Sequence, residues 1–181
     1  MKNLLLFLYI NLVFFSCISK TENSSEYEIF KADSKISAPD DNPSKYLITD
    51  FNPKSNSRVF GKVRFVQVEK NLIITAKLSG LNKGEYSIHL HENSDCSSSD
   101  GKSAGDYWDN TNKAFDKKSS KPENYKGLIK NFIVNNEKAK KIKYSTDRWC
   151  IGCKDETMDI LGKSLIIHKG FQRISCAEIV E

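Results

Sequence analysis

Apolar and polar residues alternate with a period of two along most of the chain beyond residue 58. In residues 72–78, for example, Ile74, Ala76 and Leu78 fall on one face with polar residues between them. Successive side chains of a strand point to opposite faces, so this period is typical of strands with one buried face. The pattern predicts strands over residues 59–68, 72–78, 85–91, 128–134, 142–144, 165–168 and 173–180.

Turn-forming residues separate these segments, among them Gly80, Gly84, Gly162 and Gly170. Several short strands at this spacing, with no convincing amphipathic helix, predict an all-β sandwich or barrel. Residues 92–127 form a long connection without clear periodicity. Connections of that length inside a compact domain are usually functional or disordered.

The N-terminus has a different pattern. Met1 and Lys2 precede an apolar run, residues 4–15, that ends at Ser16 and Cys17. The run is shorter than the about 20 residues needed to cross a bilayer, and its layout is that of a secretory signal. A small residue before the cysteine and a polar tail after it favour lipidation of Cys17 over an ordinary signal in which Cys17 is incidental. We therefore expect an exported protein, lipid-anchored in the bacterial envelope at the periplasm or the outer-membrane surface.

Composition divides the rest of the chain into two parts. Residues 18–43 are rich in Ser, Glu, Lys, Asp and Asn, which predicts a flexible tether after the signal peptide of residues 1–17. Residues 44–181 suit one domain with a single core. The net charge of +5 comes from scattered lysines without interleaved aromatic residues, which argues against a nucleic-acid partner.

Four cysteines remain when Cys17 is set aside, an even number that favours two disulfides in an oxidising compartment. They are Cys96, Cys150, Cys153 and Cys176. The run from Trp149 to Cys153 has the spacing of a redox motif, but it lacks the strand-then-helix setting that lowers a thiol pKa. A local structural disulfide is the favoured interpretation, and a pair that docks a soft metal is the alternative.

The chain has only three histidines. His89 and His91 lie two residues apart on a predicted strand and therefore share a face, and His168 ends another predicted strand. Imidazole suits copper and zinc. On spacing alone, structural histidines and metal ligands are equally good interpretations.

The surrounding segments favour a metal site. Residues 80–92 (GLNKGEYSIHLHE), 95–96, 100–105 (DGKSAG), 161–168 (LGKSLIIH) and 173–176 (RISC) resemble, in order, segments of the copper/zinc superoxide dismutase family. The resemblance covers about residues 45–181. It implies an eight-stranded Greek-key β-barrel and, as this family often dimerises through barrel surfaces, a homodimer as one expected assembly.

Carried over by position, the resemblance implies that His89, His91 and His168 bind copper. It implies a disulfide between Cys96 and Cys176 that pins the metal loop to the barrel. It makes Arg173 the cation that guides and holds superoxide, since an anionic substrate needs a fixed positive charge near the metal.

The chain departs from the family at the zinc site. The positions that would bind zinc carry side chains poorly suited to it: Tyr107, Phe115, Tyr125 and Leu128. We therefore expect copper and no zinc. Tyr107 stands at the position of the bridging histidine, where it acts either as a fourth copper ligand or, as we favour, as a packing replacement. Only residues 169–172 join the last histidine to Arg173, which predicts a metal more open to solvent.

These observations predict a copper-dependent superoxide dismutase-like protein with reduced activity. The alternative is a non-catalytic copper-binding or structural envelope lipoprotein on the same fold. A thiol-disulfide oxidoreductase that uses Cys150 and Cys153 is a third, less supported hypothesis.

Overall fold

The computed structural model describes residues 45–108, 126–136 and 138–181, and residues 41–181 belong to one compact unit. The predicted all-β fold is confirmed. The strands are β1 (Lys45–Pro53), β2 (Phe60–Val68), β3 (Asn71–Ser79), β4 (Gly84–His91), β5 (Leu128–Val134), β6 (Ala139–Thr146), β7 (Ser164–Lys169) and β8 (Gln172–Glu178), with a 3-10 turn η2 (Lys102–Ala104).

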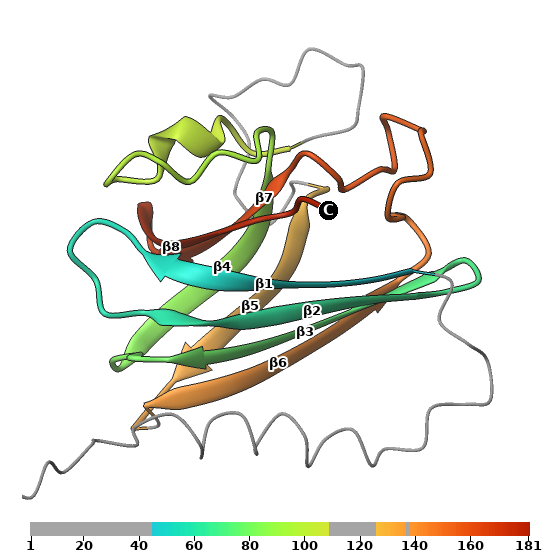
Figure 1. Ribbon diagram of the computed structural model, residues 1–181. Helices are drawn as coiled ribbons and strands as arrows, with labels where there is room; N and C mark the ends of the chain where they lie inside the picture. The colour runs from blue at the N-terminus through green and yellow to red at the C-terminus, as the bar shows by residue number, and fades with distance from the viewer. Residues whose placement is uncertain (1–44, 109–125, 137) are drawn as a thin grey trace, which may run out of the picture. The chain divides into compact units, whose positions relative to one another are not determined.

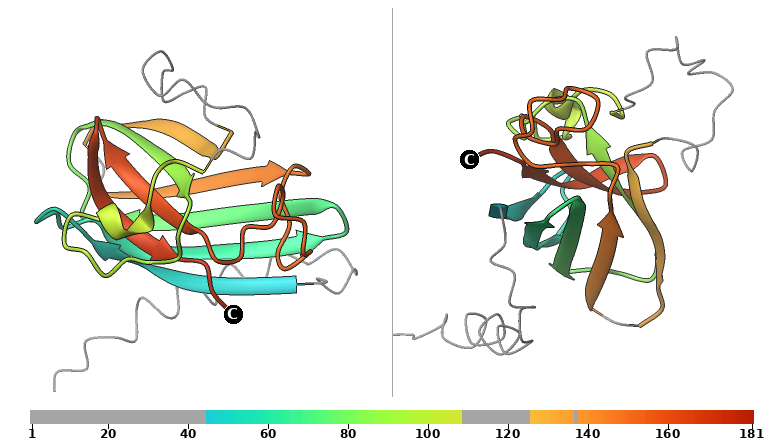
Figure 2. Two further views of the ribbon diagram at one scale, coloured as in Figure 1. Left: turned by 90° about the horizontal axis from the view of Figure 1, so that it is seen from above. Right: turned by 90° about the vertical axis from the view of Figure 1, so that its right-hand side faces the viewer.

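Every strand pairs antiparallel with its neighbours, in the order β5-β4-β7-β8-β1-β2-β3-β6. β1 joins the two halves of this sheet, because residues 45–51 pair with β2 while Asn52 and Pro53 pair with β8. Figure 1 shows the two halves lying one behind the other, and Figure 2 shows that the sheet curls into a nearly closed barrel. The core fills the space between the halves.

The period of two explains how that core is built. In β3 the alternate residues Leu72, Ile74, Ala76 and Leu78 are buried, and the residues between them are partly exposed. A one-residue shift in register would expose this whole face, so the pattern sets the register as well as the strand. β4, β7 and β8 instead carry long runs of buried residues, and the loop after β4 packs on Ile166 of β7 and Cys176 of β8 through Cys96 and Ala104.

Two strands differ from their predictions. β1 was not predicted, because only Phe51 among its nine residues is buried, while Tyr46 is 55% exposed and Ile48 42%. β6 is longer than the predicted residues 142–144, since it pairs with β3 from Ala139 to Thr146. In both cases backbone pairing with a strongly patterned neighbour makes a strand that its own hydrophobic pattern does not indicate.

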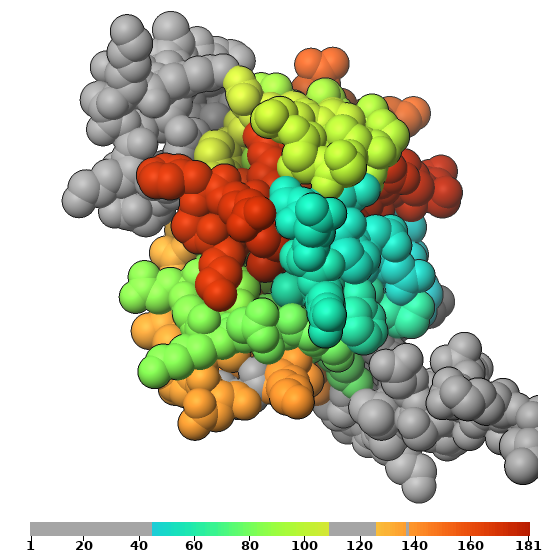
Figure 3. Space-filling view, turned by 90° about the vertical axis from the view of Figure 1, so that its left-hand side faces the viewer, coloured from blue at the N-terminus to red at the C-terminus, as the bar shows by residue number. Residues whose placement is uncertain are grey.

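The loop after β4 is fixed to β8 and to the β1–β2 turn. A disulfide joins Cys96 to Cys176, and the backbone N–H of Cys96 donates to the Glu178 carboxylate at 2.8 Å. The backbone N–H of Ser55 donates to the carbonyl of Ser99 at 2.7 Å. Figure 3 shows this yellow-green loop lying against both the cyan β1–β2 segment and the red β7–β8 segment. These contacts hold the first part of the long connection in place.

The predicted signal peptide with Cys17, the tether of residues 18–43, and Phe115 and Tyr125 lie outside the described residues. Within the described part of the chain, no helix has the length and apolar character needed to cross a bilayer.

Candidate metal centre

β4 and β7 are neighbours, and their pairing brings all three histidines to one place. His89 pairs with Ile166 and Ser87 pairs with His168 across the two strands. The register shifts between Ile88 and His89 against β5, and again at His168 against β8. Such irregularities re-aim side chains locally. Both strands are central in their half of the sheet, so the site is built on well-supported backbone.

The three imidazoles form a compact, buried cluster, which we call the histidine cluster. The Nε2 atoms of His91 and His168 face each other at 3.0 Å. The ring centroids of His89 and His168 lie 5.4 Å apart, and those of His91 and His168 lie 5.2 Å apart. None of the three side chains is more than 2% exposed. Residues 77 positions apart in sequence thus meet at one point.

Oxygen atoms anchor the outer nitrogens of two of these rings. His91 Nδ1 lies 3.1 Å from the carbonyl oxygen of Gly105, which can only accept, so Nδ1 carries the hydrogen. The Tyr107 hydroxyl lies 3.5 Å from His168 Nδ1. Metal-binding histidines are commonly oriented in this way, with one ring nitrogen held by an oxygen while the other binds the metal. The Nε2 atom of His91 therefore carries the lone pair, and it faces His168 Nε2.

Tyr107 covers the cluster. Its ring centroid lies 4.8 Å from those of His89 and His91 and 5.2 Å from that of His168, and it forms a backbone bridge with His91. That a bound copper ion would be more open to solvent stays a prediction, whereas the histidine side chains themselves are shielded from solvent. The β7–β8 connection is short, as the sequence indicated, and the aromatic ring at position 107 packs against all three imidazoles.

Burial keeps the histidines neutral. Desolvation lowers the pKa of His89 to about 4, and desolvation is likewise the main reason that the pKa of His91 falls to about 3. The pKa of His168 falls to about 2, first through burial and then through the charges of His91, His89 and Arg173. Neutral imidazoles with free lone pairs are the form that binds a metal ion.

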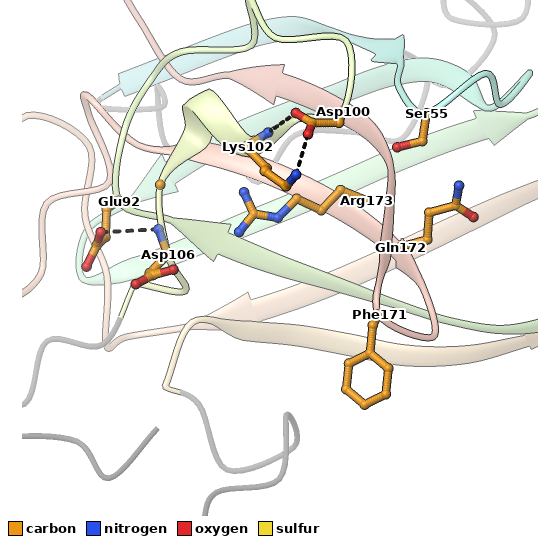
Figure 4. Close-up of a pocket in the computed structure, with 9 residues that line it drawn as sticks. Ser55, Glu92, Asp100, Lys102, Asp106, Phe171, Gln172 and Arg173 are labelled. Carbon is orange, nitrogen blue, oxygen red and sulfur yellow. Dashed lines mark hydrogen bonds and ion pairs between the residues drawn. The ribbon is translucent and has the colours of Figure 1, made fainter. Parts of the chain in front are cut away.

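Arg173 lies on β8 beside the cluster, where its charge lowers the pKa of both His91 and His168. Its Nη1 donates to the carbonyl of Gly101 at 2.8 Å. It lines a cleft of about 720 Å³, and Gly105, whose carbonyl contacts His91, lines the same cleft. In Figure 4 the guanidinium points away from Phe171 and Gln172.

The cleft is not uniformly basic. Two cations, Arg173 and Lys102, face three carboxylates, Glu92, Asp100 and Asp106. Hydrogen bonds from Lys102 lower the pKa of Asp100 to about 2, so this carboxylate is ionised at neutral pH. Figure 4 shows Lys102 paired with Asp100, and Glu92 accepting the backbone N–H of Asp106 at 3.2 Å. Among the described residues that line this cleft, the Arg173 side chain is therefore the main group that attracts an anion. The carboxylates around it weaken that attraction.

The donors fit copper. Among residues 45–108, 126–136 and 138–181, no three His, Cys, Asp or Glu side chains stand as a ready-made metal site. The histidine cluster nevertheless supplies three neutral imidazoles, a donor type that suits copper, with two Nε2 atoms directed at each other. The Tyr107 hydroxyl contacts the opposite ring nitrogen of His168, which is the geometry of a supporting residue. At the expected zinc positions, Leu128 begins β5 with a hydrocarbon side chain that cannot bind a metal.

Comparison with known proteins shows the family of this chain. The family model described as copper/zinc superoxide dismutase matches residues 59–176. The chain belongs to the copper/zinc superoxide dismutase family. No protein of curated function matches it in sequence.

Solved structures of superoxide dismutase-like proteins share the fold. A variant of such a protein from Bacillus subtilis, with a tyrosine and a proline each replaced by histidine, matches with a TM-score of 0.59 at 19% identity, over 74% of this chain and 97% of that one. Superoxide dismutase 5 from Candida albicans, in a glutamate-to-glutamine variant, matches with a TM-score of 0.57 at 21% identity, over 77% and 92%. The same Candida protein with Cu(II) gives a TM-score of 0.53 over 76% and 91%.

Sequence reasoning missed the contribution of Gly105. Its φ of 78° lies in the region that favours glycine, and an added Cβ would stand 2.8 Å from Asn93 Nδ2. This conformation presents the carbonyl that holds His91. The available signal was the glycine itself, two positions before Tyr107 in the segment DGKSAGDY.

Proposed function

We propose that this protein is a copper-dependent superoxide dismutase-like protein of the bacterial envelope. It converts two superoxide ions and two protons into dioxygen and hydrogen peroxide, at a reduced rate. The observation that carries the proposal is the histidine cluster: three buried, neutral imidazoles beside the Arg173 guanidinium, on the strands where the family sequence pattern expects them.

Copper, when bound, supplies reversible one-electron chemistry. The chain's own residues do the rest. His89, His91 and His168 hold the ion, and the Gly105 carbonyl fixes the ring of His91. Arg173 attracts and orients the anion at the cleft. The Tyr107 ring keeps bulk water from the imidazoles.

Two features support a reduced rate. The histidine side chains are almost inaccessible and the Tyr107 ring packs against them, so we expect this ring to slow the approach of an anion. A cleft lined by charge of one sign accelerates the capture of a substrate of the opposite charge. This cleft has mixed charge, because three carboxylates weaken the attraction of Arg173 for superoxide.

The burial of the cluster also favours a second candidate, a copper-binding protein without turnover. Both candidates predict copper bound in equal amount to protein. They differ only in whether superoxide reaches the ion.

Superoxide decay followed by stopped flow separates them. The compact unit, residues 41–181, is loaded with one equivalent of copper, and a His89→Ala/His91→Ala variant treated in the same way is the blank. Decay well above the blank supports the enzyme. Decay equal to the blank with one copper still bound supports the second candidate, and failure to bind copper contradicts both.

The proposed location rests on the N-terminal segment. The apolar run that ends at Cys17 supports export and attachment by a lipid on that residue. Expression of the full chain in a bacterial host, followed by membrane fractionation and intact mass, tests it. A Cys17→Ser control should lose both the lipid mass and the membrane association; an unmodified Cys17 would contradict the proposal.

A further inference from the structure

The second cysteine pair lies in the connection between β6 and β7, residues 147–163. A disulfide joins Cys150, which is half-buried, to Cys153, which is exposed. The preceding residue, Trp149, is fully buried. The connection contains turns and bends but no helix. The pair therefore lies at the surface on its Cys153 side, where we expect a reductant or a metal ion to reach it.

Hydrogen bonds hold this loop in addition to the disulfide. The Asp159 carboxylate accepts the backbone N–H of Gly152 at 2.8 Å and that of Lys154 at 3.1 Å. The Lys45 ammonium, from β1, donates to the carbonyls of Ile151 at 2.6 Å and Gly152 at 2.8 Å. These contacts span the residues between the two cysteines. These hydrogen bonds do not involve the sulfur atoms, so they should persist when the disulfide opens. Both thiols would then stay close together on one short, ordered loop.

A third sulfur belongs to the same loop. The chain has two methionines, Met1 and Met158. The backbone N–H of Cys150 donates to the carbonyl of Met158 at 2.9 Å, and Met158 is half-buried. The only methionine beyond the first residue thus has its backbone beside that of Cys150. Thiolate and thioether sulfurs are soft ligands that select Cu(I).

We propose that the loop of residues 150–158, once reduced, is a second metal site that binds Cu(I) through the thiolates of Cys150 and Cys153, with Met158 as a third donor. A dithiol reductant opens the disulfide: it gives up two electrons and two protons, becomes a disulfide itself, and leaves two thiols on the loop. Binding of Cu(I) then displaces the two thiol protons. The proposal is independent of the proposed function, because none of these donors belongs to the histidine cluster.

The chain carries its own reporter for this site. Its two tryptophans, Trp108 and Trp149, pack against each other with ring centroids 6.3 Å apart, and Trp149 precedes Cys150 directly. A disulfide beside an indole quenches its fluorescence. Reduction of the pair should therefore raise the tryptophan emission, and Cu(I) bound at the thiolates should lower it again.

The test uses the purified full chain carrying His89→Ala and His91→Ala, so that the histidine cluster is disabled. It is reduced with dithiothreitol without oxygen and freed of excess reductant. Mass spectrometry after alkylation identifies which cysteines have opened. The protein then competes for Cu(I) with a coloured bicinchoninate chelator. We expect one Cu(I) bound after reduction, none before it, and a fall in tryptophan emission that follows the binding.

Three matched samples decide the outcome. Cys150→Ser/Cys153→Ser should bind Cu(I) at least about 100-fold more weakly, and Met158→Leu about 10-fold more weakly. Reduced protein whose Cys150 and Cys153 are alkylated should behave like the double serine variant without any mutation. Equal binding by the reduced and the alkylated protein would overturn the proposal. Opening of Cys96–Cys176 before Cys150–Cys153 would overturn it as well, since the site would then form only in a damaged barrel.

Discussion

The two disulfides of this barrel hold very different segments. Cys96 and Cys176 are 80 residues apart and both buried, and their bond ties the loop after β4 to β8 beside the histidine cluster. Cys150 and Cys153 are three residues apart, and Cys153 is exposed. In the chain-entropy description, a bond that closes the long loop stabilises the fold by about 4.5 kcal/mol, and the short one by at most about 2 kcal/mol. The first bond maintains the candidate site, whereas the second is better placed for chemistry.

The largest effect should come from breaking the long-range bond. Cys96→Ser/Cys176→Ser should lower the free energy of unfolding by about 4 to 5 kcal/mol, because it releases the loop-closure constraint on the unfolded chain. Urea denaturation of metal-free protein measures this loss. The loop should also loosen around Gly105, so copper affinity should fall in the same variant. A loss below about 2 kcal/mol would mean that hydrogen bonds such as Cys96 N–H to Glu178 hold the loop instead.

The histidine cluster, which lies beside the long-range disulfide, should make the free energy of unfolding depend on pH. Histidine has a pKa near 6.5 when unfolded, and burial lowers it in the fold to about 4 for His89, about 3 for His91 and about 2 for His168. The unfolded state therefore binds protons first as the pH falls below 6.5. Stability is full above that value and decreases with falling pH. Each histidine contributes up to about 1.4 kcal/mol per pH unit, so about 3 to 4 kcal/mol should be lost between pH 6 and pH 5.

Urea denaturation of the metal-free protein at both pH values checks this loss. The chain has no other histidine, so few other groups titrate in this window. His89→Ala should remove about a third of the slope. A stability that does not change between pH 6 and pH 5 would show that water reaches the imidazoles in the fold.

The fold and the candidate site also differ in how much of each could be predicted from the sequence. Strands with a strict period of two, such as β3, were found within one or two residues, because burial of one face fixes both strand and register. The histidine cluster was predicted from motifs in order along the chain. β1 was missed, because it is held by pairing with β2 and β8 and buries only Phe51. Tyr107 was predicted as a packing residue, but its contact with all three imidazoles could not be predicted, since it depends on packing between residues far apart in sequence.

A smaller effect should follow from removing the carboxylate in the short loop. Asp159→Ala deprives the backbone N–H groups of Gly152, Lys154 and Leu161 of their acceptor. Hydrogen bonds to a charged group contribute about 1.5 to 3 kcal/mol each, but these groups are partly exposed and water replaces much of the loss. We expect a destabilisation of about 2 to 3 kcal/mol in urea denaturation. Asp155→Ala, in the same loop, is the matched control and should cost less, since its carboxylate accepts hydrogen bonds from Thr157 alone among the described side chains and N–H groups.

The smallest effect should come from the short disulfide itself. Cys150→Ser/Cys153→Ser should lower the free energy of unfolding by about 1 kcal/mol, below the bound of about 2 kcal/mol for so small a ring. The reason is that hydrogen bonds to Asp159 and from Lys45 hold the loop when the two sulfurs separate.

A double-mutant cycle tests this directly. In an Asp159→Ala background, the same serine pair should lower the free energy of unfolding by clearly more, because the disulfide and the carboxylate support one loop. If the costs simply add, the disulfide and the carboxylate act on separate structures. A loss as large as that of the Cys96–Cys176 variant would make the short bond a structural one, and its reduction in the native protein would then be out of reach.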